Sequence, residues 1–189
     1  MDKGKVIFLC GVTSSGKTSI VDSIQNISEE FYFVVANDLM VQMVGDKYLT
    51  ENYWKYESKA MYYMYHIAKL LSDMGENVLI DGCLLETPEL PNHYEIVREI
   101  FADTPFWLVE VFCPIDICRK RNLERDDRYE NQSLEQSEIW AKNVEYSFTV
   151  NTEMNTSDEC ATIILEKIAS DDRCFLVSAS LSVLDIHVA

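Results

Sequence analysis

The chain has 189 residues, of which 48% are apolar and 25% are charged. This length and composition are typical of one globular domain and exclude a wholly disordered chain. Lysine and arginine number 16 against 32 aspartate and glutamate residues, so the net charge is −16. Because nucleic acids and anionic membranes attract excess positive charge, neither is expected as a partner. An anionic ligand would need a local cluster of basic groups.

Apolar runs and helical spacing alternate along the first half of the chain. In order, they predict a strand over 6–10, a helix over 18–27, a strand over 31–35, a short helix over 38–44, one or two helices over 53–74 and a strand over 78–81. Asp38 is the expected N-cap of the short helix. Gly82 follows the third strand and is expected to end it.

The second half of the chain continues the alternation. It predicts a helix over 92–101, a strand over 106–113, a helix that starts at Pro114, a weaker strand over 147–150 and a helix over 156–168. The first and last of these helices each begin with a capping pattern, Asn92 with Glu95 and Thr156 with Glu159.

Together these elements predict an α/β fold of three layers. Continuous apolar strands that alternate with helices are typical of a parallel sheet with helices on both faces, here of about five strands. We expect one domain over residues 1–170 and a C-terminal extension of unknown role over 171–189. Ligands of such sheets bind at the carboxyl ends of the strands, so the chemistry is expected there.

Neither an export signal nor a membrane span is evident. The apolar run 6–9 near the N-terminus is too short for a signal-peptide core, and no run approaches the roughly 18 apolar residues of a spanning helix. The six cysteines are scattered without a C-x-x-C pair, which predicts reduced thiols and no zinc site. The expected location is the cytoplasm, and the oligomeric state is left open.

The loop after the first strand carries the strongest motif. It matches G-x-x-x-x-G-K-[ST] at every fixed position, through Gly11, Val12, Thr13, Ser14, Ser15, Gly16, Lys17 and Thr18. In this motif the backbone N–H groups surround nucleotide phosphates, the lysine reaches the β- and γ-phosphates and the hydroxyl binds Mg²⁺. A strand precedes the motif and a helix follows it, which favours a nucleotide site over a glycine-containing turn that matches by chance.

Several classes of nucleotide-binding protein are disfavoured. The chain has no N-K-x-D motif of signalling GTPases and no L-S-G-G-Q-like signature of transporter ATPases. The small P-loop kinases remain, with ATP and Mg²⁺ as the expected cofactors. Such a kinase also needs a carboxylate that organises Mg²⁺, a group that activates the acceptor and a basic lid.

Two carboxylates are candidates for these roles. Asp81 ends the third strand, where it would help to hold Mg²⁺; the alternative is a turn aspartate before Gly82. Asp38 follows the second strand at the same edge of the sheet, where a carboxylate could accept the proton of an acceptor hydroxyl. The alternative for Asp38 is the helix N-cap, and both roles can coexist.

Basic residues gather over 119–128, within a lid expected over roughly 119–138. Arg121, Arg125 and Arg128 are spaced so that they share one face if the segment is helical. Guanidinium groups suit bidentate phosphate contacts and stabilise charge on a transferring phosphoryl group. The alternative is a solvated helix end paired with neighbouring acidic residues.

The sequence resembles the chloramphenicol phosphotransferase family of small P-loop kinases. The spacing of the three arginines resembles that of the family's lid helix. The family's Gly-Val-Glu-Tyr segment resembles Asn143-Val144-Glu145-Tyr146, its Val-Asp-Thr segment resembles Val150-Asn151-Thr152, and its Glu-Cys-Ala segment resembles Glu159-Cys160-Ala161. The resemblance implies that Asp38 is the acceptor-activating base and that Thr152 lies near the adenine end of the nucleotide. The segment 41–104, which would shape the acceptor pocket, matches weakly.

The sequence therefore predicts an ATP-dependent O-phosphotransferase that acts on a hydroxyl group of a small molecule. Chloramphenicol is one candidate acceptor among many hydroxylated molecules. Two alternatives stay open: a kinase of the same fold that modifies a macromolecule, and a nucleotide-binding module without turnover.

Overall fold

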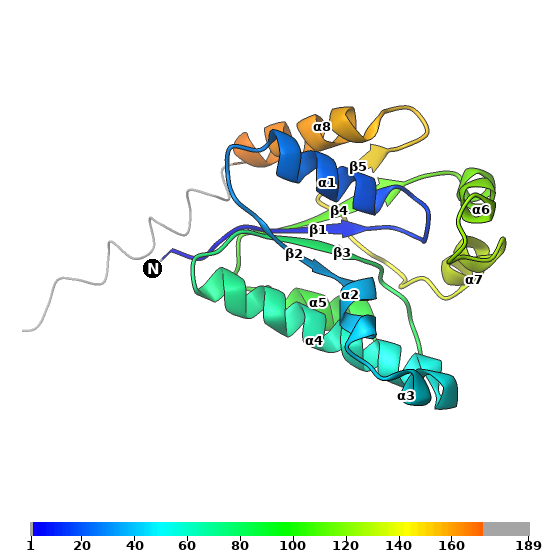
Figure 1. Ribbon diagram of the computed structural model, residues 1–189. Helices are drawn as coiled ribbons and strands as arrows, with labels where there is room; N and C mark the ends of the chain where they lie inside the picture. Colours follow the sequence, from blue (N-terminus) through cyan, green and yellow to red (C-terminus); the bar gives the residue numbers. More distant parts are fainter. Residues whose placement is uncertain (1, 172–189) are drawn as a thin grey trace, which may run out of the picture.

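A parallel five-stranded sheet organises the structure (Figure 1), a computed structural model that describes residues 2–171. The strands are β1 (Val6–Cys10), β2 (Phe33–Ala36), β3 (Val78–Gly82), β4 (Phe106–Phe112) and β5 (Phe148–Asn151). All neighbouring pairs are parallel, in the order β2-β3-β1-β4-β5. Because β1 lies in the middle, the loop after it emerges at the centre of the sheet's carboxyl edge. The predicted fold class is confirmed.

Eight helices surround the sheet in the described part of the chain. They are α1 (Lys17–Ile27), α2 (Asn37–Gln42), α3 (Asp46–Glu51), α4 (Tyr53–Asp73), α5 (His93–Ile100), α6 (Ile115–Leu123), α7 (Gln132–Glu138) and α8 (Ser157–Ala169). In Figure 1, α1 and α8 cover one face of the sheet, and α4 and α5 cover the other. The α6 and α7 helices lie beyond the carboxyl ends of the strands.

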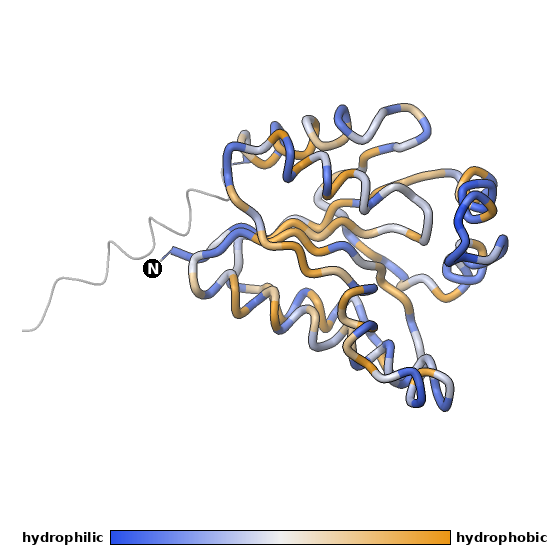
Figure 2. The backbone as a smooth tube through the Cα atoms, in the orientation of Figure 1, coloured by the Kyte–Doolittle hydropathy of each residue, from blue (hydrophilic) through white to orange (hydrophobic). Residues whose placement is uncertain are grey.

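Two apolar cores hold these layers together, one on each face of the sheet. The central strand β1 is fully buried and divides its side chains by alternation: Val6, Phe8 and Cys10 join the core beneath α4 and α5, and Ile7 and Leu9 join the core beneath α1 and α8. Figure 2 shows the resulting apolar centre. Burial of each large apolar side chain contributes about 1.5–3 kcal/mol, which makes the sheet a rigid base for the loops at its edge.

Local predictions at two helix starts are wrong. Asp38 is not an N-cap, because α2 begins at Asn37 and Asp38 lies inside its first turn. Asn92 precedes α5 but makes no side-chain cap; its backbone is left-handed, with φ of 55°, and Glu86 accepts hydrogen bonds from the N–H groups of Asn92 and His93 instead. By contrast, the capping box of Thr156 and Glu159 forms at the start of α8 as predicted.

The remaining differences are local. Residues 46–51 form the helix α3, which was not predicted, and residues 53–73 form a single helix, one of the two alternatives predicted for this segment. None of the helices within residues 2–171 has both the length and the apolar character needed to cross a membrane. The expected C-terminal extension lies outside the described residues except for Asp171, and the domain boundary at 170 stays a prediction.

Candidate active site

A cavity of about 860 Å³ opens at the carboxyl edge of the sheet. The loop after β1, the ends of β2 and β3, the segment that contains α6 and α7, and the loop after β5 all contribute to its wall. Of the predicted site residues, only Val12 and Ser15 do not line it. Residues from these five separate parts of the chain therefore meet where the sheet topology predicts a ligand.

The loop after β1 has the tight curvature that its glycines allow. A Cβ atom on Gly11 would lie 2.6 Å from the carbonyl oxygen of Val111, which leaves no room for a side chain. Gly16 has a φ of 103°, a conformation that side chains rarely adopt. Ser14 also has a positive φ, of 58°. This backbone turns inward and leads directly into α1, so its N–H groups and the helix dipole favour an anion.

The polar side chains of this loop lack partners of the kind that a phosphate would provide. The ammonium group of Lys17 donates to the carbonyl oxygen of Val12 at 3.0 Å, a neutral partner for a full charge. The hydroxyl oxygens of Ser14 and Ser15 are buried and make no hydrogen bond in the described structure. The N–H of Thr13 donates to Gln136 Oε1 of α7 at 2.7 Å. The loop thus presents several donors and one cation that an anionic ligand could engage.

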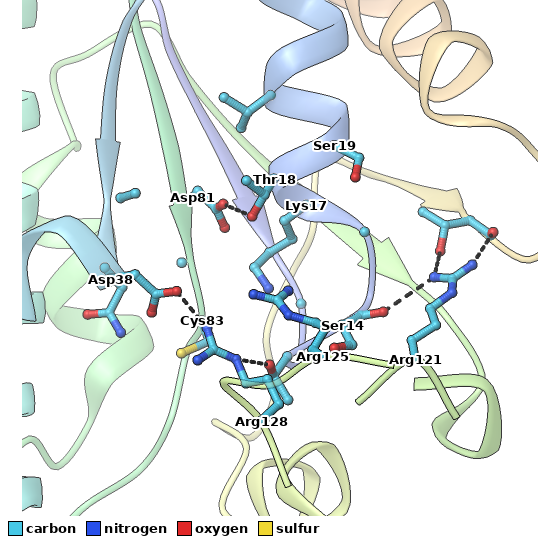
Figure 3. A pocket seen from close by; sticks show the side chains of 18 of the residues that line it. Ser14, Lys17, Thr18, Ser19, Asp38, Asp81, Cys83, Arg121, Arg125 and Arg128 are labelled. Carbon is cyan, nitrogen blue, oxygen red and sulfur yellow. Dashed lines mark hydrogen bonds and ion pairs between the residues drawn. The ribbon is translucent and has the colours of Figure 1, made fainter. Parts of the chain in front are cut away.

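Thr18 and Asp81 meet beside the loop. The Thr18 hydroxyl donates to Asp81 Oδ2 at 2.7 Å, so the start of α1 and the end of β3 place two oxygen ligands together (Figure 3). Hard oxygen atoms are the ligands that Mg²⁺ prefers, and it is commonly held by one or two protein groups together with phosphates and water. Within residues 2–171 no three His, Cys, Asp or Glu side chains form a metal cluster. The Thr18–Asp81 pair fits a Mg²⁺ ion shared with a nucleotide.

Arg121 joins the phosphate loop to the loop after β5. Its guanidinium donates to Thr152 Oγ1 at 3.1 Å, to the Thr152 carbonyl at 3.0 Å and to the Ser14 carbonyl at 3.3 Å. Thr152 in turn donates to the Ser15 carbonyl at 2.6 Å, and its side chain would contact a Cβ atom on Gly16 at 3.2 Å. These contacts hold Arg121 and Thr152 against the loop at one end of the cavity. Figure 3 shows Arg121 at this end, on the far side of the loop from Asp38.

Arg128 lies at the opposite end and contacts Asp38. Its Nη2 donates to Asp38 Oδ2 at 2.6 Å, and its Nε donates to Thr13 Oγ1 at 3.1 Å. Arg125 donates from Nε and Nη2 to the two carboxylate oxygens of Asp127, both at 2.9 Å. That ion pair raises the pKa of Arg125 and lowers the pKa of Asp127. Arg125 and Arg128 therefore each form an ion pair with a carboxylate, and both arginines line the cavity.

The three arginines do not share a helix face, contrary to the sequence expectation. The α6 helix ends at Leu123, so only Arg121 is helical, and Arg125 and Arg128 come from the loop before α7. Buried Asn122 folds this loop back, because its amide donates to the Glu130 carbonyl and to the Ser133 hydroxyl. All three guanidinium groups reach the cavity through this turn rather than through helical spacing.

Asn37, Tyr53 and Glu57 form a polar group in the cavity wall that the predicted set of site residues did not include. Glu57 Oε1 accepts hydrogen bonds from Asn37 Nδ2 at 3.3 Å and from the Tyr53 hydroxyl at 3.2 Å. Burial raises the pKa values of Glu57 and Tyr53, and nearby acidic charge raises them further. Glu57 lies on the buried face of α4 among apolar residues, and that break in the apolar pattern was the available signal.

Comparison with known proteins assigns a family and a fold. The family model described as Chloramphenicol phosphotransferase-like protein matches residues 4–169. Two Mycobacterium tuberculosis proteins, from strains CDC 1551 / Oshkosh and ATCC 25618 / H37Rv, are each 23% identical over 185 residues, covering 85% of this chain and 80% of the relative. Both carry the name "Putative O-phosphotransferase".

Solved structures of small kinases share the architecture. The Mycobacterium tuberculosis APS kinase CysC, in complex with AMPPNP and APS, matches with a TM-score of 0.65 and 18% identity over 90% of this chain and all of its own. Shikimate kinase from Acinetobacter baumannii, in complex with shikimate, matches with a TM-score of 0.61 and 14% identity over 89% and 95% of the two chains. A gluconokinase from Sinorhizobium meliloti 1021 matches with a TM-score of 0.60 and 15% identity over 89% and 93%. At these identities the likeness shows the P-loop kinase fold.

Proposed function

The chain belongs to the chloramphenicol phosphotransferase-like family, and on that premise we propose that it transfers the γ-phosphate of ATP to a hydroxyl group of a small molecule. One observation carries this proposal. The phosphate loop, two carboxylates and three arginines from distant parts of the chain line one cavity. A protein that only binds a nucleotide needs neither a carboxylate opposite the phosphate loop nor a set of arginines around the transferring group.

The nucleotide half of the cavity has a clear assignment under this proposal. The backbone of residues 11–16 and the Lys17 ammonium group bind the phosphates, and Thr18 with Asp81 holds Mg²⁺. The bound Mg²⁺ would neutralise charge on the phosphates. Thr152, which contacts Arg121 and the phosphate loop, lies toward the adenine end of the nucleotide.

The transfer step is assigned to Asp38 and the three arginines, which line the cavity from the Arg128–Asp38 pair to Arg121 beside Thr152. Asp38 accepts the proton of the acceptor hydroxyl. The oxygen of that hydroxyl attacks the γ-phosphorus, and the bond between the γ-phosphorus and the bridging oxygen of ADP breaks. Arg121, Arg125 and Arg128 stabilise the negative charge that spreads over the transferring oxygens. Because Arg128 contacts both Asp38 and the phosphate loop, it lies where acceptor and phosphate would meet.

Lys17→Ala tests the proposal directly. The lysine supplies charge rather than core packing, so the variant should fold, lose most ATP affinity and lose phosphotransfer. The assay measures transfer of the labelled γ-phosphate from ATP to small hydroxylated metabolites and antibiotics. Thermal unfolding is measured on the same samples. Lys120→Ala is the matched control, because Lys120 is exposed and outside the cavity. Unchanged transfer in the Lys17 variant would contradict the kinase assignment.

The acceptor screen also separates the other functions considered. Transfer of label to proteins or RNA of a cell lysate, without transfer to any small molecule, would favour a macromolecular kinase. ATP binding with no transfer to any acceptor would favour a binding module. The acidic net charge of −16 disfavours an RNA acceptor.

A further inference from the structure

Two buried side chains of the cavity wall carry oxygen atoms that have no hydrogen-bond partner. Asn37 is 9% exposed and Glu57 is 4% exposed, and both line the cavity. Asn37 Oδ1 and Glu57 Oε2 are buried, and no donor in residues 2–171 reaches them. Since buried polar atoms in folded proteins are almost always paired, two such atoms on residues that contact each other in the cavity wall point to a ligand.

The free oxygens are held in place by the other atoms of the same groups. Asn37 Nδ2 donates to Glu57 Oε1 at 3.3 Å, which fixes how the amide is oriented. The Tyr53 hydroxyl, one turn earlier on α4, donates to the same carboxylate oxygen at 3.2 Å. One oxygen of Glu57 is therefore satisfied twice and the other is left free. The start of α2 and the first turns of α4 thus form a preorganised site.

We infer that Asn37 and Glu57 bind a second hydroxyl group of the acceptor, so that the substrate is a diol or a larger polyol rather than a mono-alcohol. This inference rests on the proposed function. Asn37 immediately precedes Asp38, so the two hydroxyls lie on the same part of the acceptor: one beside the base and one beside the Asn37–Glu57 pair.

A hydroxyl is the group that this pair can bind in either protonation state of Glu57. Asn37 Oδ1 only accepts hydrogen bonds, so the ligand must donate to it. Glu57 Oε2 accepts when ionised and can donate when protonated, and burial raises the pKa of this carboxyl. A hydroxyl can donate and accept at once, whereas an ammonium group can only donate.

The inference is tested with matched alcohols in the presence of a non-hydrolysable ATP analogue. Glycerol and xylitol are compared with propan-1-ol and pentan-1-ol by ligand-detected NMR titration. Wild-type protein should bind each polyol at least about three- to tenfold more tightly than its mono-alcohol, the effect of one or more net hydrogen bonds. Glu57→Met removes both carboxylate oxygens and should remove that preference without weakening nucleotide binding, whereas Glu57→Gln offers the same donor as protonated Glu57 and should keep it.

Further measurements distinguish this role from a structural one. Glu57→Gln should be at least as stable as wild type, because it keeps the Oε1 acceptor and removes a carboxylate whose ionisation burial disfavours. Any polyol that is phosphorylated should show a raised KM and an unchanged kcat in Glu57→Met, and wild-type constants in Glu57→Gln. Glu51→Met, at an exposed residue of neighbouring α3 outside the cavity, is the matched control and should behave as wild type.

The outcomes separate the inference from the function on which it rests. Polyols that bind no better than mono-alcohols, or a Glu57→Met variant that lowers kcat and leaves KM unchanged, would overturn the inference while phosphotransfer stands. If polyols bind in preference to mono-alcohols through Glu57 but no acceptor is phosphorylated, the binding site would stand and the proposed phosphotransfer function would be contradicted.

Discussion

At the residue scale, Arg128 connects the two halves of the proposed reaction. It donates to Asp38 on α2 and to Thr13 in the phosphate loop, so one guanidinium joins the proposed base to the phosphate site. The Asp38 side chain is 67% exposed in this ion pair and Arg128 is 17% exposed. An exposed ion pair of this kind contributes about 0–1 kcal/mol to stability, so its position serves the site more than the fold.

Asp38→Asn separates a catalytic role from a structural one. Because Asp38 does not cap α2, the substitution removes only its ion pair, and the free energy of unfolding should change by less than about 1 kcal/mol. ATP affinity should hold, since the phosphate loop is untouched. The phosphotransfer rate at saturating acceptor should fall roughly 10²–10⁴-fold, the usual contribution of a positioned general base.

The comparison for Asp38 is the same substitution at Asp46. Asp46 lies in the first turn of α3, is exposed and does not line the cavity, so Asp46→Asn should retain wild-type turnover. Turnover, ATP binding and thermal unfolding are measured on the same preparations of each protein. Full turnover in Asp38→Asn would assign the carboxylate to the ion pair alone and require another base.

At the element scale, the start of α5 shows how a tertiary contact replaces a local signal. Glu86 comes from the segment after β3 and accepts from two N–H groups at the helix start, at 3.0 and 3.3 Å. A carboxylate at a helix N-terminus also interacts favourably with the helix dipole. The neighbouring Asn92 adopts the left-handed backbone that asparagine tolerates, so it ends the preceding turn rather than capping the helix.

Glu86→Ala should therefore destabilise the protein by about 1–2 kcal/mol, the usual cost of a lost N-terminal cap. For a domain of this size the melting temperature should fall by roughly 2–8 °C. Differential scanning calorimetry measures the change. Glu89→Ala is the control, because Glu89 is exposed in the same segment. Equal melting temperatures for the two variants would show that Glu86 does not cap α5.

The elements that could be predicted are those whose signal is local. The central strands β1, β3 and β4 followed from apolar runs, because strands buried on both faces exclude most polar residues, as in fully buried β1. The phosphate loop followed from its glycines, since a close approach at Gly11 and a positive φ at Gly16 tolerate little else. The capping box of Thr156 and Glu159 could also be predicted, because the two residues lie only three positions apart in the sequence.

The parts that were missed depend on contacts between distant residues. The arginine segment has helical spacing, yet α6 ends at Leu123 and Asn122 folds the following loop onto α7. The Asn37–Glu57 pair joins α2 to α4 across 20 residues, and neither residue belongs to a motif. Spacing alone cannot reveal such pairs, because only the packed sheet brings α2 and α4 together.

At the scale of the whole molecule, the cavity wall is less acidic than the chain as a whole. The chain carries −16, whereas the cavity is lined by four cations, Lys17, Arg121, Arg125 and Arg128, and by five carboxylates, Asp22, Asp38, Glu57, Asp81 and Glu124. An acidic surface repels polyanions that are too large to enter such a cavity, whereas a bound Mg²⁺ neutralises part of the charge of a nucleotide. The charge distribution therefore supports the proposed nucleotide site.

The stability of the whole molecule depends on a buried neutral histidine. His93 is fully buried; its Nδ1 donates to the Leu85 carbonyl at 3.0 Å, and its Nε2 accepts from the Tyr65 hydroxyl at 2.8 Å. Burial lowers the pKa of His93 to about 4, against 6.5 for an ordinary histidine. Between about pH 4 and pH 6.5, His93 is protonated in the unfolded chain and neutral in the folded protein. The folded state must therefore lose stability as the pH falls through this window.

The expected loss is about 3 kcal/mol between pH 7 and pH 4, from 1.36 kcal/mol per pKa unit. Urea unfolding at a series of pH values measures it. Glu57 acts in the opposite direction because its pKa is raised, so the His93 contribution is read from the difference between wild type and His93→Gln, in which the effect of Glu57 cancels. His93→Gln should be less stable at pH 7 and should lose less stability on acidification, whereas His66→Gln, at an exposed site, should follow wild type. Parallel pH profiles for wild type and His93→Gln would show that His93 has the same pKa in the folded and unfolded states and that its burial does not control acid stability.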